Sequence, residues 1–452
     1  MSATLHAASA LTPDGWRSDV GIAIDGARIA SVTLGVAARA GDERHAIVIP
    51  AVANLHCHAF QRAMAGLAER RGPGDDSFWS WREAMYRFAL TMSPDDVEAV
   101  AAQLYVEMLE AGFASVAEFH YLHNAPDGAP YASPAEMAGR IFAAARAAGI
   151  GLTLLPVFYA HSTFGGAPPK PEQRRFVNDR ESFGRLIENC RQYVEDGGER
   201  LGVAPHSLRA VTPEELADVA SMAPEGPIHI HVAEQTKEVQ DCLAWSGRRP
   251  VRWLLDTTDA DRRWCLVHAT HMDADETRAA AKSGAVVGLC PVTEANLGDG
   301  VFDAPAFIAA GGRYGVGTDS NVSLGAACEL RQLEYSQRLM LRARNVLARP
   351  GGSTAGAMLD AALSGGAQAL ARDCGRLEAG AAADLLALGA EHAALVGKTG
   401  DAILDAWIFS AGNRAVDCVW SSGRKVVATG RHIAGERIAA RFRATIARLA
   451  GL

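Results

Sequence analysis

Residues 94–122 of this 452-residue chain read PDDVEAVAAQLYVEMLEAGFASVAEFHYL, and this stretch indicates the fold. Apolar side chains recur at helical spacing over 94–112, and a short apolar run follows at 113–122. A helix that leads directly into a short buried strand is part of a βαβ unit, the building block of parallel sheets. The fold class therefore depends on how often this unit recurs along the chain.

Eight short apolar runs alternate with helix-like stretches. They are IPAVANLHCH (49–58), FASVAEFHYL (113–122), IGLTLLPVFYA (150–160), LGVAPHSL (201–208), IHIHVAE (228–234), WCLVHATH (264–271), AVVGLCPVT (285–293) and YGVGTDSN (314–321). Eight strand–helix units fit a closed barrel, and the chain is long enough for one with an appended layer. The sequence thus predicts an α/β fold with a (β/α)8, TIM-like barrel.

Both ends of the chain are rich in predicted strands. Residues 1 to about 50 alternate between polar and apolar side chains, and 382–390 and 416–433 contain strands and turns. The simplest packing joins the two ends into one small β-sandwich. The predicted domains are 1–48 for the N-terminal part of the sandwich, 49–350 for the barrel with flanking helices to about 375, and 376–452 for the rest of the sandwich and an amphipathic terminal helix.

Composition and charge exclude several classes of partner. The net charge is −8 and no run of Lys and Arg occurs, so we expect no nucleic-acid surface. No window approaches 18 uninterrupted apolar residues, and residues 1–10 lack the pattern of a signal peptide, so we expect no membrane association. The eight cysteines form no CxxC pair, which indicates buried, reduced thiols in a cytoplasmic protein.

The first strand ends in His56-Cys57-His58. Side chains two residues apart on a strand point to the same face, so the two imidazoles lie together and Cys57 points away from them. Imidazole nitrogens bind Zn²⁺ at about 2.0–2.1 Å. This motif alone is a weak signal for a metal site.

The fifth predicted strand carries His229, His231 and Glu234. Both histidines face the same way, so either could be a ligand. We favour His231, because it lies nearer the carboxyl end of the strand, where the sites of barrel enzymes form. Glu234 would place an acid–base group beside that ligand.

Strands six and eight also end in polar residues, His268 and Asp319. Each motif alone is more often structural. Metal-competent residues at the ends of strands one, five, six and eight of an otherwise apolar barrel nevertheless predict a metal site together.

Five further residues fall on loops expected to surround this site: Gln61, Arg82, Tyr121, His206 and Arg209. A lone arginine usually has a surface role. Two arginines facing a metal suggest a substrate with carboxylates, because the guanidinium fork binds carboxylates through two hydrogen bonds.

These motifs, together with GRLEAGAAADLLAL and VWSSGRKVVATGRH near the C-terminus, resemble the one-metal deaminases of the amidohydrolase superfamily over nearly the whole chain. The resemblance implies that His56, His58, His231 and Asp319 are the ligands. It implies that His268 is a base that contacts water or substrate and that Glu234 is the proton shuttle. The fourth strand lacks the lysine of two-metal relatives, which favours a single divalent ion. We expect Zn²⁺, although Fe²⁺ suits the same ligands.

LHCHAFQRAMAGLAERR, FWSWREAMY, EFHYLHN, APHSLRAV, HIHVAEQ and LCPVTEANLGDG together resemble the formimidoylglutamate deiminase family. This resemblance implies hydrolysis of a dicarboxylate amidine, whose glutamate moiety Gln61, Arg82, Tyr121, His206 and Arg209 would hold, in a homodimeric enzyme. The alternatives are a one-metal aminohydrolase acting on a nucleobase or nucleoside, and a catalytically inactive barrel that serves as an assembly subunit.

Overall fold

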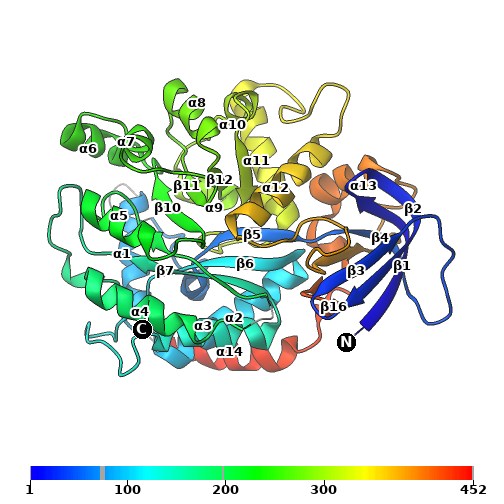
Figure 1. Ribbon diagram of the computed structural model, residues 1–452, viewed down its shortest axis with the longest axis horizontal. Coiled ribbons are helices and arrows are strands. Elements are labelled where there is room, and N and C mark those ends of the chain that lie inside the picture. Colours follow the sequence, from blue (N-terminus) through cyan, green and yellow to red (C-terminus); the bar gives the residue numbers. More distant parts are fainter. Residues whose placement is uncertain (1, 72–76, 196–197, 450–452) are drawn as a thin grey trace.

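Figure 1 shows the computed structural model, which describes residues 2–71, 77–195 and 198–449. The outermost residues of the predicted terminal regions, 1 and 450–452, lie outside the described residues. The described chain contains two parallel sheets with helices around them, and a third, larger sheet formed by the two chain ends.

All eight predicted runs contribute strands to the two parallel sheets. The first sheet contains β5 (Val52–Cys57), β6 (Phe113–His120), β7 (Gly151–Phe158), β8 (Arg200–Leu201) and β9 (Ala204–Pro205). The second contains β10 (Ile228–Val232), β11 (Trp264–His268), β12 (Val286–Leu289) and β13 (Arg313–Val316). Every strand pair within these sheets is parallel, as predicted.

The structure differs from the prediction in the closure of the barrel. The regular pairing ends after β13 and after β8, and within the described residues the two sheets are linked by isolated parallel bridges: Cys57 with Asp319, Val203 with Ile228, and Ser207 with His231. The fourth predicted strand is interrupted at Gly202, where a Cβ atom would lie 2.3 Å from the carbonyl oxygen of Pro227. The arrangement is therefore mixed α/β with parallel sheets, without a continuous ladder around a barrel.

Helices and short helical turns connect these strands. They are η1 (Ala59–Met64), α1 (Phe78–Ala89), α2 (Pro94–Glu110), α3 (Glu136–Ala148), η2 (Pro171–Gln173), α4 (Arg180–Arg191), α5 (Pro213–Ser221), α6 (Thr236–Ser246), α7 (Pro250–Thr257), α8 (Ala274–Ser283), α9 (Pro291–Leu297), α10 (Ala304–Ala309), α11 (Ala326–Leu341) and α12 (Thr354–Ala369). The helix predicted at 94–112 ends two residues early. Ser93 caps its start, and Gly112, at φ +91°, turns the chain into β6.

The two chain ends form one eight-stranded sheet in the order β17-β16-β15-β14-β4-β1-β2-β3. Its strands are β1 (Ser2–Thr12), β2 (Gly15–Asp25), β3 (Arg28–Thr33), β4 (Glu43–Pro50), β14 (Leu385–Leu388), β15 (Val416–Ser421), β16 (Arg424–Ala428) and β17 (Arg431–His432). The predicted union of both ends is confirmed, because β4 pairs with both β1 and β14. The predicted sandwich is not confirmed, because the ends meet edge to edge within one sheet.

The remaining elements near the C-terminus are α13 (Asp401–Ala406), η3 (Trp407–Ala411), η4 (Gly412–Ala415) and α14 (Gly435–Leu449). The last of these is the predicted amphipathic helix; it packs against α2.

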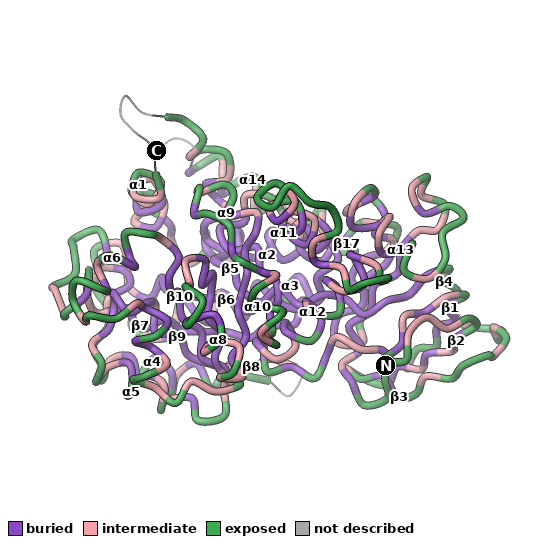
Figure 2. The backbone as a smooth tube through the Cα atoms, turned by 90° about the horizontal axis from the view of Figure 1, so that it is seen from above, coloured by how far each residue is buried: buried purple, intermediate pink, exposed green. Residues whose placement is uncertain are grey.

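Every residue of β5, β6, β7, β10 and β11 is buried, and Figure 2 shows purple, buried backbone around the labels of β5 and β6. Both faces of each strand are covered, which explains the near-continuous apolar runs of the sequence. Polar side chains at the ends of such strands are therefore held in a rigid, largely water-free frame.

None of the helices in the described part of the chain combines the length and the apolar character that crossing a bilayer requires. All eight cysteines are free, and all except Cys328 are buried, as predicted.

Candidate metal centre and active site

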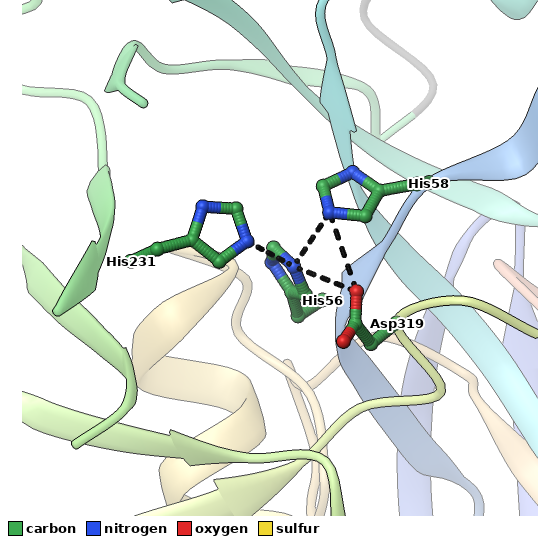
Figure 3. Close-up of side chains that lie close together, drawn as sticks. All are labelled: His56, His58, His231 and Asp319. Carbon is green, nitrogen blue, oxygen red and sulfur yellow. Dashed lines mark hydrogen bonds and ion pairs between the residues drawn. The ribbon is translucent and has the colours of Figure 1, made fainter. Parts of the chain in front are cut away.

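Four predicted side chains converge where strands end: His56 and His58 at the end of β5, His231 on β10 and Asp319 just after β13 (Figure 3). His56 Nε2 lies 3.2 Å from His58 Nε2 and 3.1 Å from His231 Nε2. Asp319 Oδ1 lies 3.4 Å from His56 Nε2 and 3.3 Å from His58 Nε2. The bridge between Cys57 and Asp319 brings the first and last strands together and so assembles this cluster.

Second hydrogen bonds orient two of these rings. His58 Nδ1 lies 3.0 Å from the carbonyl oxygen of Phe119, and His231 Nδ1 lies 3.0 Å from that of His206. A carbonyl only accepts, so each Nδ1 carries the proton and each Nε2 presents a lone pair. Burial, the main cause, also lowers the pKa of His56, His58 and His231, which keeps the rings neutral.

Lone pairs that face one another at this distance repel unless a cation lies between them. Three neutral imidazoles and one carboxylate are a ligand set typical of a divalent metal site, and hydrogen bonds to backbone carbonyls are the usual support of ligating histidines. The four residues therefore fit one divalent metal ion.

The structure shows which of the two histidines on β10 belongs to the cluster: His231 does, and His229 does not. His229 Nε2 donates to the carbonyl oxygen of Ala369 on α12, at 2.8 Å, and His229 is not among the residues whose ligand atoms come together. Another group of potential ligands, Glu43, His45 and Cys418, lies in the large sheet. There, Glu43 already forms an ion pair with the ammonium group of Lys425.

The backbone at the site adopts an unusual conformation. Ala233, His268 and Asp319 all have positive φ, between 46° and 67°, which non-glycine residues seldom adopt. Asn321 stabilises this geometry, because its Nδ2 donates to the carbonyl oxygens of Asp319 and His58 at 2.9 and 3.0 Å. The strained turns aim the side chains into the cavity.

Glu238, on α6, fixes the turn that carries Glu234. One of its carboxylate oxygens accepts from the backbone N–H of Ala233, and the other from that of Glu234, both at 3.2 Å. Glu238 is buried, and the sequence motifs gave no reason to select it.

His268 lies between three carboxylates. Its Nε2 lies 3.9 Å from Glu234 Oε1 and 3.7 Å from Asp319 Oδ2, and its Nδ1 lies 3.2 Å from Glu294 Oε1. Burial alone would lower the pKa of His268, but the carboxylates outweigh it and raise it to about 10. Burial raises the pKa of Glu234 to about 7, against the opposing effect of His268 and Arg209. The distances from His268 Nε2 to Glu234 and Asp319 are longer than hydrogen bonds. A reacting atom could therefore lie between these three side chains, which can exchange protons.

All five residues predicted to bind substrate line the cavity beside this cluster. The cavity is lined by His58, Gln61, Phe78, Trp81, Arg82, Met85, Tyr86, Tyr121, Tyr159, Phe176, His206, Arg209, His231, Glu234, His268, Leu297 and Asp319. One expectation was wrong: Arg82 lies on α1 and not on a loop, because the hydroxyl of Ser77 caps a helix that begins at Phe78. Several aromatic residues of the wall, among them Tyr86 and Tyr159, were not predicted from the sequence.

The two arginines of the cavity lack carboxylate partners among the described residues. Arg209 is 8% exposed and its Nε has no hydrogen-bond partner. Burial opposes its charge, yet Glu238 and Glu234 outweigh burial and raise the pKa of Arg209. The Arg82 guanidinium lies over the ring of Trp79, 4.5 Å from its centroid. Two cations without ion pairs at one cavity favour an anionic ligand.

Gln61 and Tyr121 form a neutral polar pair on the same wall. Gln61 Nε2 donates to the Tyr121 hydroxyl at 2.9 Å, and Gln61 Oε1 has no partner. Both side chains are buried, so the unpaired carbonyl oxygen can accept a hydrogen bond from a ligand.

Comparison with known proteins places this geometry in a family. The model of the amidohydrolase family matches residues 47–426, and that of the N-terminal domain of formimidoylglutamate deiminase HutF matches residues 2–46. The chain is 52% identical over 442 residues to a formimidoylglutamate deiminase from Pseudomonas aeruginosa, with 97% of each chain covered.

Solved structures agree with the sequence comparison. An amidohydrolase from Brucella melitensis superposes with a TM-score of 0.95 and 57% identity, covering 99% of this chain and 100% of that one. An adenosine deaminase from Xanthomonas campestris with bound zinc has the same fold, with a TM-score of 0.82 at 22% identity and coverage of 100% and 99%. Because the family match spans most of the chain and includes every residue of the metal cluster, the chain belongs to the amidohydrolase family.

Proposed function

We propose that this protein hydrolyses N-formimidoyl-L-glutamate to N-formyl-L-glutamate and ammonia. The proposal rests on the cavity, in which two arginines that have no carboxylate partner among the described residues adjoin a cluster of three histidines and an aspartate. A substrate with two carboxylates and one hydrolysable amidine matches both parts. The similarity to the deiminase from Pseudomonas aeruginosa supports the same reaction.

His56, His58, His231 and Asp319 would hold one divalent metal, which we propose is Zn²⁺. Three imidazole nitrogens and one carboxylate oxygen, ligand types that Zn²⁺ favours, support this choice. A divalent cation bound there would supply Lewis acidity that makes water a nucleophile at neutral pH.

Asp319 would accept a proton from the attacking water, and His268 would help to orient this water, since both face the space beside the cluster. The water oxygen forms a bond to the formimidoyl carbon, and the imine nitrogen of the substrate takes up, through Glu234, the proton that the water loses. The hydroxyl group of the adduct gives up the second water proton as it becomes a carbonyl, Glu234 passes this proton to the same nitrogen, the carbon–nitrogen bond breaks, and ammonia leaves. The carbon keeps the oxygen as the formyl carbonyl, so one water is consumed for each ammonia released.

Arg82 and Arg209 would bind the carboxylates of the glutamate moiety, while Gln61, Tyr121 and His206 complete its pocket. Burial, the main cause, and the neighbouring Arg209 lower the pKa of His206, which favours a neutral ring beside the ligand. The unpaired Gln61 oxygen suits an N–H of the substrate.

The assay that tests the proposal measures ammonia release from formimidoylglutamate, guanine, cytosine and adenosine under identical conditions. We expect turnover of formimidoylglutamate alone. Preference for a ring substrate would favour the alternative, a nucleobase or nucleoside aminohydrolase, whereas no release from any substrate by metal-loaded protein would favour an inactive assembly subunit.

Loss of either arginine should weaken catalysis selectively. A hydrogen bond to a charged group contributes about 1.5–3 kcal/mol, so Arg209→Met and Arg82→Met should each lower kcat/KM for formimidoylglutamate by roughly 10- to 150-fold. The amide analogue of the substrate should lose much less. Steady-state kinetics on both compounds, after metal analysis, measure the difference.

Arg87→Met is the matched control for Arg82, because Arg87 is an exposed arginine on the same helix and does not line the cavity. It should leave kcat/KM unchanged. Equal losses on charged and uncharged amidines would mean that the arginines support the fold, and the assignment to a glutamate derivative would be withdrawn.

The proposal extends to the arrangement of the sheets and to the boundaries of the structural units. We propose that the strands of the two parallel sheets form one closed (β/α)8 barrel; the bridges between them support this arrangement. The large sheet would fold over into a sandwich, since Ile29, on the edge strand β3, exchanges backbone hydrogen bonds with Gly380 and Ala381, just before β14. The unit boundaries would be 1–48, 49–350 with helices to about 375, and 376–452.

We further propose a homodimer located in the cytoplasm. Eight free cysteines support a reducing compartment. Light scattering of the purified protein tests the dimer.

A further inference from the structure

The helix α1 forms one wall of the cavity. Phe78, Trp81, Arg82 and Met85 share one face of this helix and line the cavity. Its first two turns are half-buried or exposed, and burial becomes complete only at Met85, Tyr86 and Ala89 near its end. The residues that grip this end therefore determine where Arg82 lies.

Arg175 grips it. The side chain is completely buried, and its Nη1 donates to the carbonyl oxygen of Ala89, in the last turn of α1, and to that of Met92 at 2.8 Å. Its Nε donates to the carbonyl oxygen of Asn124, also at 2.8 Å. Burial lowers the pKa of Arg175, and no carboxylate contributes to its stabilisation. The guanidinium instead interacts with the negative end of the helix, whose last carbonyls have no partners within the helix.

The segment around Arg175 touches both α1 and the wall of the cavity. Gln173 Nε2 donates to the Tyr86 hydroxyl at 3.3 Å and to the Tyr159 hydroxyl at 2.6 Å. The ring of Phe176 lies 6.0 Å from that of Tyr86. The same segment is anchored to the residues just after β6, because the backbone N–H groups of His123 and Asn124 both donate to the carbonyl oxygen of Arg175 at 3.0 Å.

We propose that Arg175 is a positioning residue, which fixes the end of α1 to the strand ends and thereby holds Arg82 over the cavity for a substrate carboxylate. A buried cation without a carboxylate is costly; among the described residues, three backbone carbonyls that connect these segments accept hydrogen bonds from Arg175, and Tyr131 also favours its charge. The inference rests on the proposed function, since Arg82 matters only for an anionic substrate.

A double-mutant cycle with Arg82 tests the proposal. Arg175→Lys keeps the positive charge but loses the several N–H donors of the guanidinium group. It should raise KM for formimidoylglutamate about tenfold, the effect of one misplaced charge-assisted hydrogen bond, and should leave kcat within about threefold of the native value. In the Arg82→Met background, Arg175→Lys should raise KM by less than about twofold, because the residue through which Arg175 acts is absent. Arg174→Lys is the matched control, since Arg174 donates to the carbonyls of Pro126 and Pro171 and not to α1.

Hydrogen exchange gives a readout that does not depend on activity. Amides of residues 78–92 should exchange faster in Arg175→Lys than in the native protein and in Arg174→Lys, while those of 228–234 should not change. Should Arg175→Lys fail to fold, Arg175→Gln removes the buried charge, keeps one donor and enters the same cycle.

Equal losses in both backgrounds, or unchanged exchange in α1, would overturn the positioning role. Native protein without activity on formimidoylglutamate would instead refute the proposed function, and the exchange experiment would still report whether Arg175 holds α1.

Discussion

Replacing Glu234 with glutamine is expected to lower kcat on formimidoylglutamate by roughly 10²–10⁴-fold, the range typical of a group that transfers a proton in the transition state. The metal content and the fold should be unchanged, because Glu234 is not part of the cluster of ligands and its backbone N–H, which Glu238 holds, is unaffected. Glutamine has the same shape but carries no transferable proton, so ammonia would have to leave without help. Rapid-quench measurement of turnover, after metal analysis, gives the size of the loss.

Asp299→Asn is the matched control for this substitution. Asp299 is a buried carboxyl near Glu234 that does not line the cavity, and burial raises its pKa to about 9, with Glu234 as a further cause. Loss of an already neutral carboxyl should change kcat by less than about tenfold, below the range for proton transfer. If Glu234→Gln kept near-normal turnover, another group would have to protonate the leaving nitrogen.

The metal cluster could be predicted from the sequence because strand periodicity and chain direction suffice to locate it. Alternation places His56 and His58 on one face, and parallel strands bring the ends of β5, β10 and β13 to the same side. Position along β10 also favoured His231 over His229, and the hydrogen bond of His229 to Ala369 agrees with that choice.

The supporting residues could not be predicted, because nothing periodic marks them. Glu238 and Glu294 lie on helices that follow the strands, and Arg175 lies in a segment between elements. Their roles depend on which backbone groups remain without partners once the chain is folded, and this is a property of tertiary structure. The position of Arg82 on a helix was missed for a related reason: the capping interaction of Ser77 outweighed the loop-like appearance of the flanking sequence.

The sandwich was expected because two strand-rich ends must bury apolar faces. The structure joins the two ends through direct pairing of β4 with β14, which composition and periodicity alone do not specify. Pairing between distant segments is set by register and turn geometry, and neither is visible in alternation.

Loss of a metal ligand is also expected to have a large effect on this protein. The native protein should bind about one divalent ion per chain, and His231→Asn should abolish both tight binding and turnover, because it removes one of the three nitrogens of the cluster, which lies 3.1 Å from His56 Nε2. Loss of a residue that only supports a ligand typically weakens metal affinity 10- to 100-fold, so loss of a ligand should exceed that range. Elemental analysis of dialysed protein, together with ammonia release, measures both quantities.

His229→Asn makes the comparison decisive. The two histidines are two residues apart on β10 and both are buried, but His229 donates to the carbonyl oxygen of Ala369, away from the cluster. His229→Asn should therefore lower the free energy of unfolding by about 1–3 kcal/mol, the cost of an unsatisfied buried group, and keep the metal. His231→Asn should lose the metal, but it should lower the free energy of unfolding of the metal-free protein less than His229→Asn does. Removal of the His231 imidazole relieves the repulsion among the facing lone pairs. Equal metal loss in both variants would show that the ion depends on the integrity of β10 and not on a ligand. Two ions per chain at full activity would contradict the one-metal site, even if His231 proved to be one of its ligands.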